Sequence, residues 1–323
     1  MAGTNKAAAS GQVPRLTPEM RADLAVRIIM RYLLTAMQAN EAGVHAGTDA
    51  ECLHDFRIAV RRQRSLLGQI RGTIPQRIRQ RLDNGFAWLG EITREARDLD
   101  VYLLDLMDDN NSLLAGFGQE LDPLREFFRH RQLLAHRQLS ASLESARYAR
   151  LMTAWNAYLD TPPTVRSSLP DARHPVLALA NQRIRRMLRR VIKQGKAVDT
   201  DSSPQDLHEL RKSCKKLRYL MELFQSLYPV AGLRQPVKAL KGLQDSLGEY
   251  QDLQVQMGFL ATFRQSVAPD TGTLRRALAA TEALSRKLEK RQNKVRQALR
   301  LRFDAFAEEK YQRDFRRVFS ADD

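Results

Sequence analysis

Two stretches of the sequence carry a histidine followed by three basic residues, at a spacing that gathers all four side chains on one face of a helix. The first stretch contributes His54, Arg57, Arg61 and Arg64, and the second contributes His208, Arg211, Lys215 and Arg218. Cations at these spacings repel one another, and no acidic residue stands where it would relieve the repulsion. Arginine offers phosphate oxygens a planar fork, and lysine adds a point charge. The pattern therefore predicts binding of a repeating chain of phosphates.

Further basic residues extend the predicted binding surface. Neighbouring positions on the same two helices add Arg62, Lys212 and Lys216. The helix expected before each of them adds Arg31, Arg185 and Arg189. The segment 183–196 holds seven basic residues and no acid, so the second half is expected to be the more electropositive there. A merely solvated basic face is the alternative for a single stretch, but recurrence of the stripe in both stretches favours a binding role.

Metal binding is the sharpest alternative for His54 and His208, because imidazole is a common metal ligand. The surrounding arginines and lysines would repel a divalent cation, and no cysteine or carboxylate stands at ligand spacing on either stripe. We expect contact with an anion or a role at the helix N-terminus, with plain structural packing as a further alternative. If the histidines touch phosphate, binding should strengthen as the pH falls through about 6.5.

Glu95, Asp98 and Asp100 resemble the acidic ligands of a phosphatase metal site, yet their spacing does not place all three on one helical face. We interpret them as ion-pair partners that fix arginine side chains. The sequence contains no glycine-rich phosphate loop, no GxSxG and no HExxH. We therefore expect a protein that is not an enzyme, with no catalytic residue, no metal site and no cofactor.

The two basic stretches belong to a longer internal match with an offset of 154 residues, as from His54 to His208. The same offset, without a gap, relates Pro75 to Pro229, Glu95 to Glu249 and Asp98 to Asp252. This match over residues 53–101 and 207–255 predicts an internal duplication. Between the copies, residues 161–172 are rich in proline, which ends helices, and are predicted to form a linker.

Apolar residues at i, i+3, i+4 and i+7 predict helices in both copies, and no segment shows the alternation of a strand. In the first copy we expect helices at 18–42, 49–71, 75–108 and 121–160. In the second copy we expect them at 173–196, 204–226, 232–265 and 272–318. The predicted fold is all-α, with a flexible tail at 1–15 and four-helix repeats at 16–160 and 173–318. We expect the two bundles to be related by a pseudo-twofold axis around a basic channel.

The composition fits a folded, basic protein. The chain has 323 residues, of which 43% are hydrophobic, so a sizeable core is possible. Its net charge of +16 favours partners such as phosphates, nucleic acid or anionic lipid. Two cysteines, Cys52 and Cys214, are too few for a disulfide framework and fit a reducing compartment. No stretch has the apolar length of a membrane span or a signal peptide, so we expect a cytoplasmic protein without a membrane partner, either monomer or homodimer.

The motifs LHDFRIAVRRQRS, LHELRKSCKKLRYLMELF and REARDLDVYL resemble the CHAD domain, the conserved-histidine α-helical domain, over about residues 16 to 318. The resemblance implies two four-helix repeats that bind inorganic polyphosphate in a central basic channel, and association with polyphosphate granules. The ExExK signature of the CYTH domain, a triphosphate-processing partner in this family, is absent, so we expect a stand-alone module. In the second copy Gln251 and Gln254 replace charged residues of the family's acidic motif, which predicts fewer charged pairs there.

Two other functions compete with polyphosphate binding. A single-stranded nucleic-acid-binding protein would interleave aromatic and basic residues to stack bases, whereas Tyr219 is the only aromatic residue near either stripe. Nucleic acid is therefore possible but disfavoured as a partner. A phosphate-metabolising enzyme is the third candidate, and it would release orthophosphate from polyphosphate in a reaction that a chelator abolishes.

Overall fold

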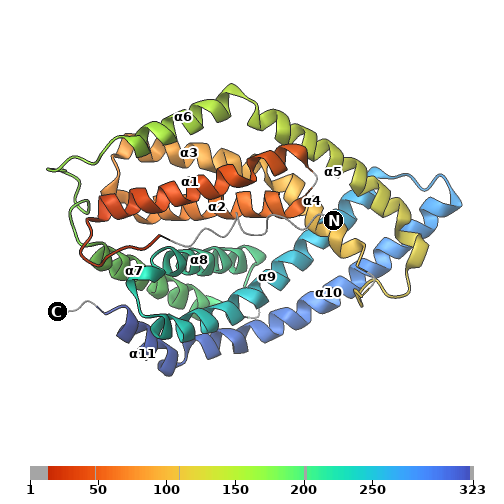
Figure 1. The fold of residues 1–323 in the computed structure, drawn as a ribbon. Coiled ribbons are helices and arrows are strands. Elements are labelled where there is room, and N and C mark those ends of the chain that lie inside the picture. Colours follow the sequence, from red (N-terminus) through yellow and green to blue (C-terminus); the bar gives the residue numbers. More distant parts are fainter. Residues whose placement is uncertain (1–13, 48, 109, 200–201, 321–323) are drawn as a thin grey trace, which may run out of the picture.

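The protein is built from α-helices in a computed structural model that describes residues 14–47, 49–108, 110–199 and 202–320 (Figure 1). The first half contains α1 (Ala22–Ala46), α2 (Ala50–Gln69), α3 (Gln76–Ile92), α4 (Arg94–Leu106), α5 (Asp122–Leu143) and α6 (Ala146–Asp160). The second half contains α7 (Val176–Ala197), α8 (Pro204–Leu223), α9 (Val230–Ser266), α10 (Gly272–Ala307) and α11 (Glu309–Val318). Short 3-10 helices η1 (Arg71–Thr73), η2 (Gly118–Leu121) and η3 (Gln225–Leu227) lie in the connections. Within these ranges no strand forms, so the predicted all-α fold is confirmed.

Local caps fix where the two stripe-bearing helices begin. Asp49 caps α2, because its carboxylate accepts a hydrogen bond from the Glu51 N–H at 2.8 Å. Ser203 and Asp206 form a capping box at the start of α8, each side chain accepting from the backbone of the other. These contacts satisfy N–H groups that the first helical turn leaves without an acceptor. Both caps stand five residues before the histidine of their stripe, so the two stripes start at equivalent points.

Three predicted helices are interrupted. Residues 75–108 form α3 and α4, which meet at Thr93, where the hydroxyl donates to the Leu89 carbonyl at 2.6 Å and favours a bend. Residues 121–160 form α5 and α6, because Ser145 caps a new helix there. Residues 272–318 form α10 and α11, with Glu308 in a non-helical conformation between them. The prediction of one continuous helix in each place is wrong, because apolar periodicity continues across breaks that single polar residues cause.

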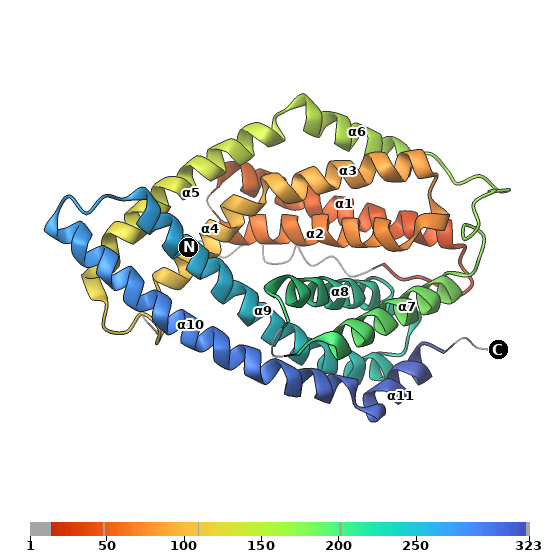
Figure 2. The ribbon, with the colours of Figure 1, turned by 180° about the vertical axis from the view of Figure 1, so that it is seen from behind.

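The two halves of the chain form two sides of one molecule (Figures 1 and 2). Helices α1, α2 and α3 lie side by side in the first half, and α7 and α8 lie together in the second. Between the halves, α2 packs against α8. The long helices α9 and α10 lie along each other, and α10 reaches α5 of the first half. The helices that carry the predicted stripes therefore meet at the boundary between the halves.

One hydrophobic core runs through both halves. Tyr102 of α4 stacks on Phe259 of α9, with ring centroids 4.6 Å apart. Phe127 of α5 meets Phe263 of α9 edge-on at 5.4 Å. Aromatic pairs of this geometry contribute about 0.5–1.5 kcal/mol beyond the burial of their surface. This shared core fixes α4 relative to α9 and so positions the cleft described below.

Residues 1–13 of the predicted flexible tail lie outside the described residues. Between α6 and α7, residues 161–175 contain no helix. Of the helices described, none combines the length and the hydropathy that crossing a membrane requires.

Candidate anion-binding cleft

A cavity of about 580 Å³, here called the basic cleft, lies between α2 and α4 of the first half and α8 and α9 of the second. The sequence-predicted residues that line it are His54, Arg57, Arg61, His208 and Arg211. Its other polar lining residues are Arg94, Arg97, Asp98, Asp105, Gln251, Asp252 and Gln256. The histidine ends of the two stripes, distant in sequence, therefore line one cavity.

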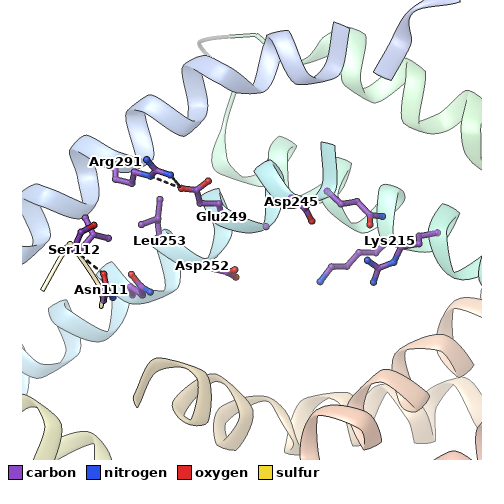
Figure 3. A pocket seen from close by; sticks show the side chains of 13 residues that line it. Asn111, Ser112, Lys215, Asp245, Glu249, Asp252, Leu253 and Arg291 are labelled. Carbon is purple, nitrogen blue, oxygen red and sulfur yellow. Dashed lines mark hydrogen bonds and ion pairs between the residues drawn. The ribbon is translucent and has the colours of Figure 1, made fainter. Parts of the chain in front are cut away.

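A second cavity of about 740 Å³, here called the end pocket, adjoins the basic cleft beside α9 (Figure 3). Asp252 and Gln256 line both cavities, which makes the two spaces neighbours. Lys215 and Arg218 line the end pocket. Arg218 also pairs with Glu222, four residues later on α8, at 3.2 Å, so the expectation that no acid relieves the repulsion along the stripe is wrong at Arg218. Half of the predicted binding residues thus surround adjoining spaces: His54, Arg57, Arg61, His208, Arg211, Lys215 and Arg218.

Arg57 is held rigidly at the wall of the basic cleft, with only 5% of its surface exposed. Its Nη1 atom donates to Thr93 Oγ1 at 2.6 Å and to the Gly90 carbonyl at 3.4 Å. Burial, and then repulsion from Arg61, lowers the pKa of Arg57 to about 10. The guanidinium therefore stays charged at neutral pH, and the bend between α3 and α4 supplies its hydrogen-bond acceptors.

The cations around Lys215 come from both halves and repel one another. The Arg211 side chain is 18% exposed and lies 3.9 Å from the Asp252 carboxylate. Burial, and then repulsion from three neighbouring arginines, lowers the pKa of Lys215 to about 7. These arginines are Arg211, Arg61 and Arg218, and the Asp252 charge only partly offsets them. An anion in this space would relieve the repulsion, because an opposite charge favours the protonated form of lysine.

The two histidines have different partners at equivalent positions. Arg97 donates from Nη2 to Nδ1 of His54 at 3.0 Å. Because arginine cannot accept a hydrogen bond, this His54 is neutral and carries its proton on Nε2. Burial, and then the Arg97 charge, lowers the pKa of His54. In the second half the Nδ1 atom of His208 lies 2.8 Å from Gln251 Oε1 and donates to it. The pair Arg97 and Gln251 obeys the offset of 154 residues.

Two aspartates in the basic cleft face arginines. Burial raises the pKa of Asp98, and Arg57 is the first of the cations that oppose this rise. Burial likewise raises the pKa of Asp252, and Arg211 opposes it. The interpretation of Asp98 as a carboxylate that fixes an arginine stays a prediction. Within the described residues, no group of three or more histidine, cysteine, aspartate and glutamate side chains is arranged to hold a metal ion.

The other two acids of the first-half motif point to partners outside the cleft. Glu95 forms an ion pair with Arg131 at 2.9 Å. Asp100 is buried and accepts hydrogen bonds from His136 at 2.8 Å and Gln132 at 2.7 Å. They therefore fasten α4 to α5 and leave Asp98 as the motif's carboxylate in the cleft.

Three predicted residues on α2 and α8 lie outside both cavities, and two of them form ion pairs with neighbouring acids. Arg62 pairs with Glu222 across the boundary between the halves at 2.8 Å. Lys212 pairs with Glu209 at 2.5 Å on its own helix. Lys216 is half-buried, and its pKa is lowered by burial and by nearby cations. None of the predicted residues in this group lines the basic cleft or the end pocket.

The remaining predicted residues also lie away from both cavities. Arg31 of α1 pairs with Asp160 of α6 at 2.5 Å. Arg185 lines a separate cavity of about 410 Å³ at the start of α7. Arg64 and Arg189 are exposed on α2 and α7. The structure thus does not bring this second half of the predicted set into the cleft.

Several cleft residues were not among the predicted binding residues. Arg94 and Arg97 belong to the REARDLDVYL motif, and the offset of 154 residues pairs Arg97 with Gln251, so the sequence carried a signal for them. Arg291 of α10 reaches the end pocket and pairs with Glu249 of α9 at 2.5 Å. No motif marks Arg291, because only the packing of α10 on α9 brings it there.

These features define an all-helical protein with a basic cleft between its two halves. The family model of the CHAD domain matches residues 28–261, more than half of the chain, so the chain belongs to the CHAD domain family. No curated protein matches it.

Two solved structures share the fold. The crystal structure of the CHAD domain from the plant Ricinus communis is 25% identical, with 91% of this chain and 95% of that chain covered and a TM-score of 0.74. PptA from Streptomyces chartreusis is 14% identical, with 90% of this chain and 100% of that chain covered and a TM-score of 0.62. The second likeness concerns the fold alone.

Proposed function

We propose that the protein binds inorganic polyphosphate, with the chain of phosphates lying in the basic cleft. The observation that carries this proposal is the meeting of cations from α2 and α8 around adjoining cavities. Without a bound anion these cations repel one another, and this repulsion contributes, after burial, to the lowered pKa of Lys215. A ligand with one negative charge per repeating unit matches such a row of fixed cations.

The proposal includes a duplicated architecture, in which two repeats related by a pseudo-twofold axis form a basic channel. Two contacts support it: His54 with Arg97, and His208 with Gln251, which follow the same spacing in the two halves. Each repeat would then supply one wall of the binding site. The match between the repeats is weaker around the acidic motif, where the second half has glutamine.

The cleft favours a ligand without bases over single-stranded nucleic acid. Tyr219 is only 6% exposed, with the guanidinium carbons of Arg62 and Arg218 at 6.0 and 5.5 Å from its ring centroid. Tyr102, the aromatic residue that lines the cleft, is 4% exposed and stacks within the core. Stacking of bases needs accessible aromatic faces. Neither tyrosine offers one, which supports polyphosphate as the ligand.

We further propose a binding module that is not an enzyme and that works in the cytoplasm at polyphosphate granules. The charged residues of the cleft are cations and carboxylates, with glutamines beside them, an arrangement suited to holding an anion. Incubation of the pure protein with polyphosphate should release no orthophosphate. Release that stops on addition of a chelator would instead support the phosphate-metabolising alternative.

Replacing one cleft arginine from each half tests the proposal. Arg61→Ala combined with Arg211→Ala should weaken binding of long-chain polyphosphate by about tenfold or more. The slope of log K against log salt should become shallower by about 1.4, by analogy with about 0.7 per phosphate contact in single-stranded nucleic acid. Fluorescence anisotropy with labelled polyphosphate at several salt concentrations measures both quantities.

A control pair removes the same charge elsewhere. Arg286→Ala with Arg317→Ala changes two exposed residues of α10 and α11 that pair only with acids of their own helices. This variant should retain nearly all of the affinity. Equal losses of affinity in the two variants would contradict the proposed site. In a separate competition experiment, displacement of polyphosphate by single-stranded DNA of matched charge at equal concentration would contradict the proposed ligand.

A further inference from the structure

The two halves differ at one position beside the cleft. The offset of 154 residues relates Arg94 in the first half to Gly248 in the second. Arg94 lines the basic cleft and pairs with Glu91 at 2.7 Å. Gly248 lines the end pocket, and a Cβ atom added to it would meet no atom within 4 Å. The second half therefore has open space where the first half has an arginine side chain.

The end pocket combines cations with carboxylates. Lys215 comes from α8, and Asp245 and Asp252 come from α9 (Figure 3). Opposite them, Arg291 of α10 holds Glu249 in an ion pair. The side chains of Asn111, Ser112, Gln244 and Gln256 complete the polar lining. The pocket thus offers hydrogen-bond acceptors as well as positive charge.

An internal phosphate of a polyphosphate chain fits such a lining poorly. It carries one negative charge and only acceptor oxygens. In the end pocket the carboxylates of Asp245, Glu249 and Asp252 equal the lining cations in number, whereas in the basic cleft the cations outnumber the carboxylates. A terminal phosphate has a second ionisation near pH 6, as in a phosphate monoester, and in its monoprotonated form it carries a P–O–H donor. Such a group can donate to a carboxylate while its other oxygens accept from Lys215 and Arg218.

We propose that the end pocket receives the terminal phosphate of a polyphosphate chain whose internal phosphates lie in the basic cleft. This inference rests on the proposed function and adds recognition of a chain end. Asp252 and Gln256 line both cavities, so a chain can pass from one into the other. In the first half Arg94 takes the space that corresponds to Gly248, so the recognition is confined to one end of the site.

The test compares two short polyphosphate chains of equal length, one unmodified and one with both terminal phosphates converted to methyl esters. The esters remove the P–O–H donor and leave the internal phosphates unchanged. The wild-type protein should bind the unmodified chain about tenfold more tightly, the effect of roughly one hydrogen bond to a charged group. Isothermal titration calorimetry measures both affinities under one set of conditions.

Gly248→Arg supplies the decisive variant, because it restores the residue type of the first half and fills the end pocket. Arginine suits a helix better than glycine, and the open space around Gly248 accommodates it. Although this variant adds a positive charge, it should lose the preference and bind the unmodified and the esterified chain with about equal affinity. Gly242→Arg is the matched control, since Gly242 lies on α9 outside both cavities with no atom within 4 Å of an added Cβ. It should keep the wild-type preference.

Three outcomes overturn the inference. Equal binding of the two chains by the wild-type protein refutes recognition of the chain end and leaves polyphosphate binding intact. Retention of the preference by Gly248→Arg refutes the assignment to this pocket. Failure of the wild-type protein to bind either chain refutes the proposed function, and the inference with it.

Discussion

Lys215 is the residue at which the electrostatics of the cleft are most visible. Its side chain is half-buried near arginines from both halves, and its pKa is about 7 where an exposed lysine would titrate near 10.4. Near neutral pH the unliganded protein therefore holds this side chain only partly protonated. A bound polyanion would raise the pKa of Lys215, so binding would take up a proton wherever the free amine is neutral.

The pH dependence of binding should reveal this group. Below about pH 7 Lys215 is already protonated in the free protein, and its contribution to affinity is constant. Above pH 7 the affinity should fall by up to about tenfold per pH unit, because one proton must be taken up on binding. Titration calorimetry in buffers of different ionisation enthalpy measures the proton uptake directly.

Lys215→Arg should remove the fall above pH 7, because arginine stays charged throughout. Lys294→Arg, on the exposed face of α10, is the matched control and should keep the wild-type profile. His54 acts in a different pH range. Because its pKa is lowered, protonation of its imidazole should strengthen polyphosphate binding only below about pH 6.5. An unchanged profile in Lys215→Arg would exclude Lys215 as the titrating group.

At the scale of elements, the bend between α3 and α4 distinguishes the first half from the second. Thr93 interrupts the helix and receives the Arg57 guanidinium. At the equivalent position the second half has Leu247, and α9 runs through without a break. Arg211 therefore lacks that hydroxyl acceptor and is more exposed than Arg57. One wall of the cleft thus holds its arginine rigidly, and the other holds its arginine more loosely.

Thr93→Val tests the bend. The variant keeps the shape of the side chain but leaves the buried Arg57 Nη1 without its 2.6 Å acceptor. We expect the free energy of unfolding to fall by about 1–3 kcal/mol, measured by urea denaturation. Thr161→Val is the control, because its hydroxyl also donates to a carbonyl four residues earlier but is exposed. A change there should stay within about 0.5 kcal/mol, and an equal loss in both variants would argue against a special role of Arg57.

At the scale of the whole molecule, we expect the shared core to make the two halves one folding unit. Phe263 is 1% exposed and packs against Phe127 of the first half. Both tryptophans, Trp88 and Trp155, lie in the first half. Tryptophan fluorescence therefore reports on the first half, whereas far-UV circular dichroism reports on all helices.

Phe263→Ala should lower the free energy of unfolding by about 3–5 kcal/mol, because it leaves a large cavity in the core. We expect the fluorescence and circular dichroism transitions in urea to shift together, as a cooperative unit requires. If the tryptophan signal kept the wild-type midpoint while the circular dichroism midpoint moved, the halves would fold independently and the shared core would not couple them.

The sequence by itself determined the features that depend on local periodicity. The helical class, the two stripes and the offset of 154 residues all follow from spacing along the chain, since a helix turns by a fixed angle per residue. The breaks at Thr93 and Ser145 were missed, because one side-chain hydrogen bond can end a helix without disturbing its apolar pattern.

Only the tertiary structure decided which cations share a cavity. Arg61 and Lys215 line adjoining spaces, whereas Arg62 pairs with Glu222 and Arg31 with Asp160, although the sequence predicts a binding role for all four. The reason is that side-chain direction along a helix is local, while the approach of α8 to α2 and of α10 to α9 depends on a core built from residues far apart in sequence.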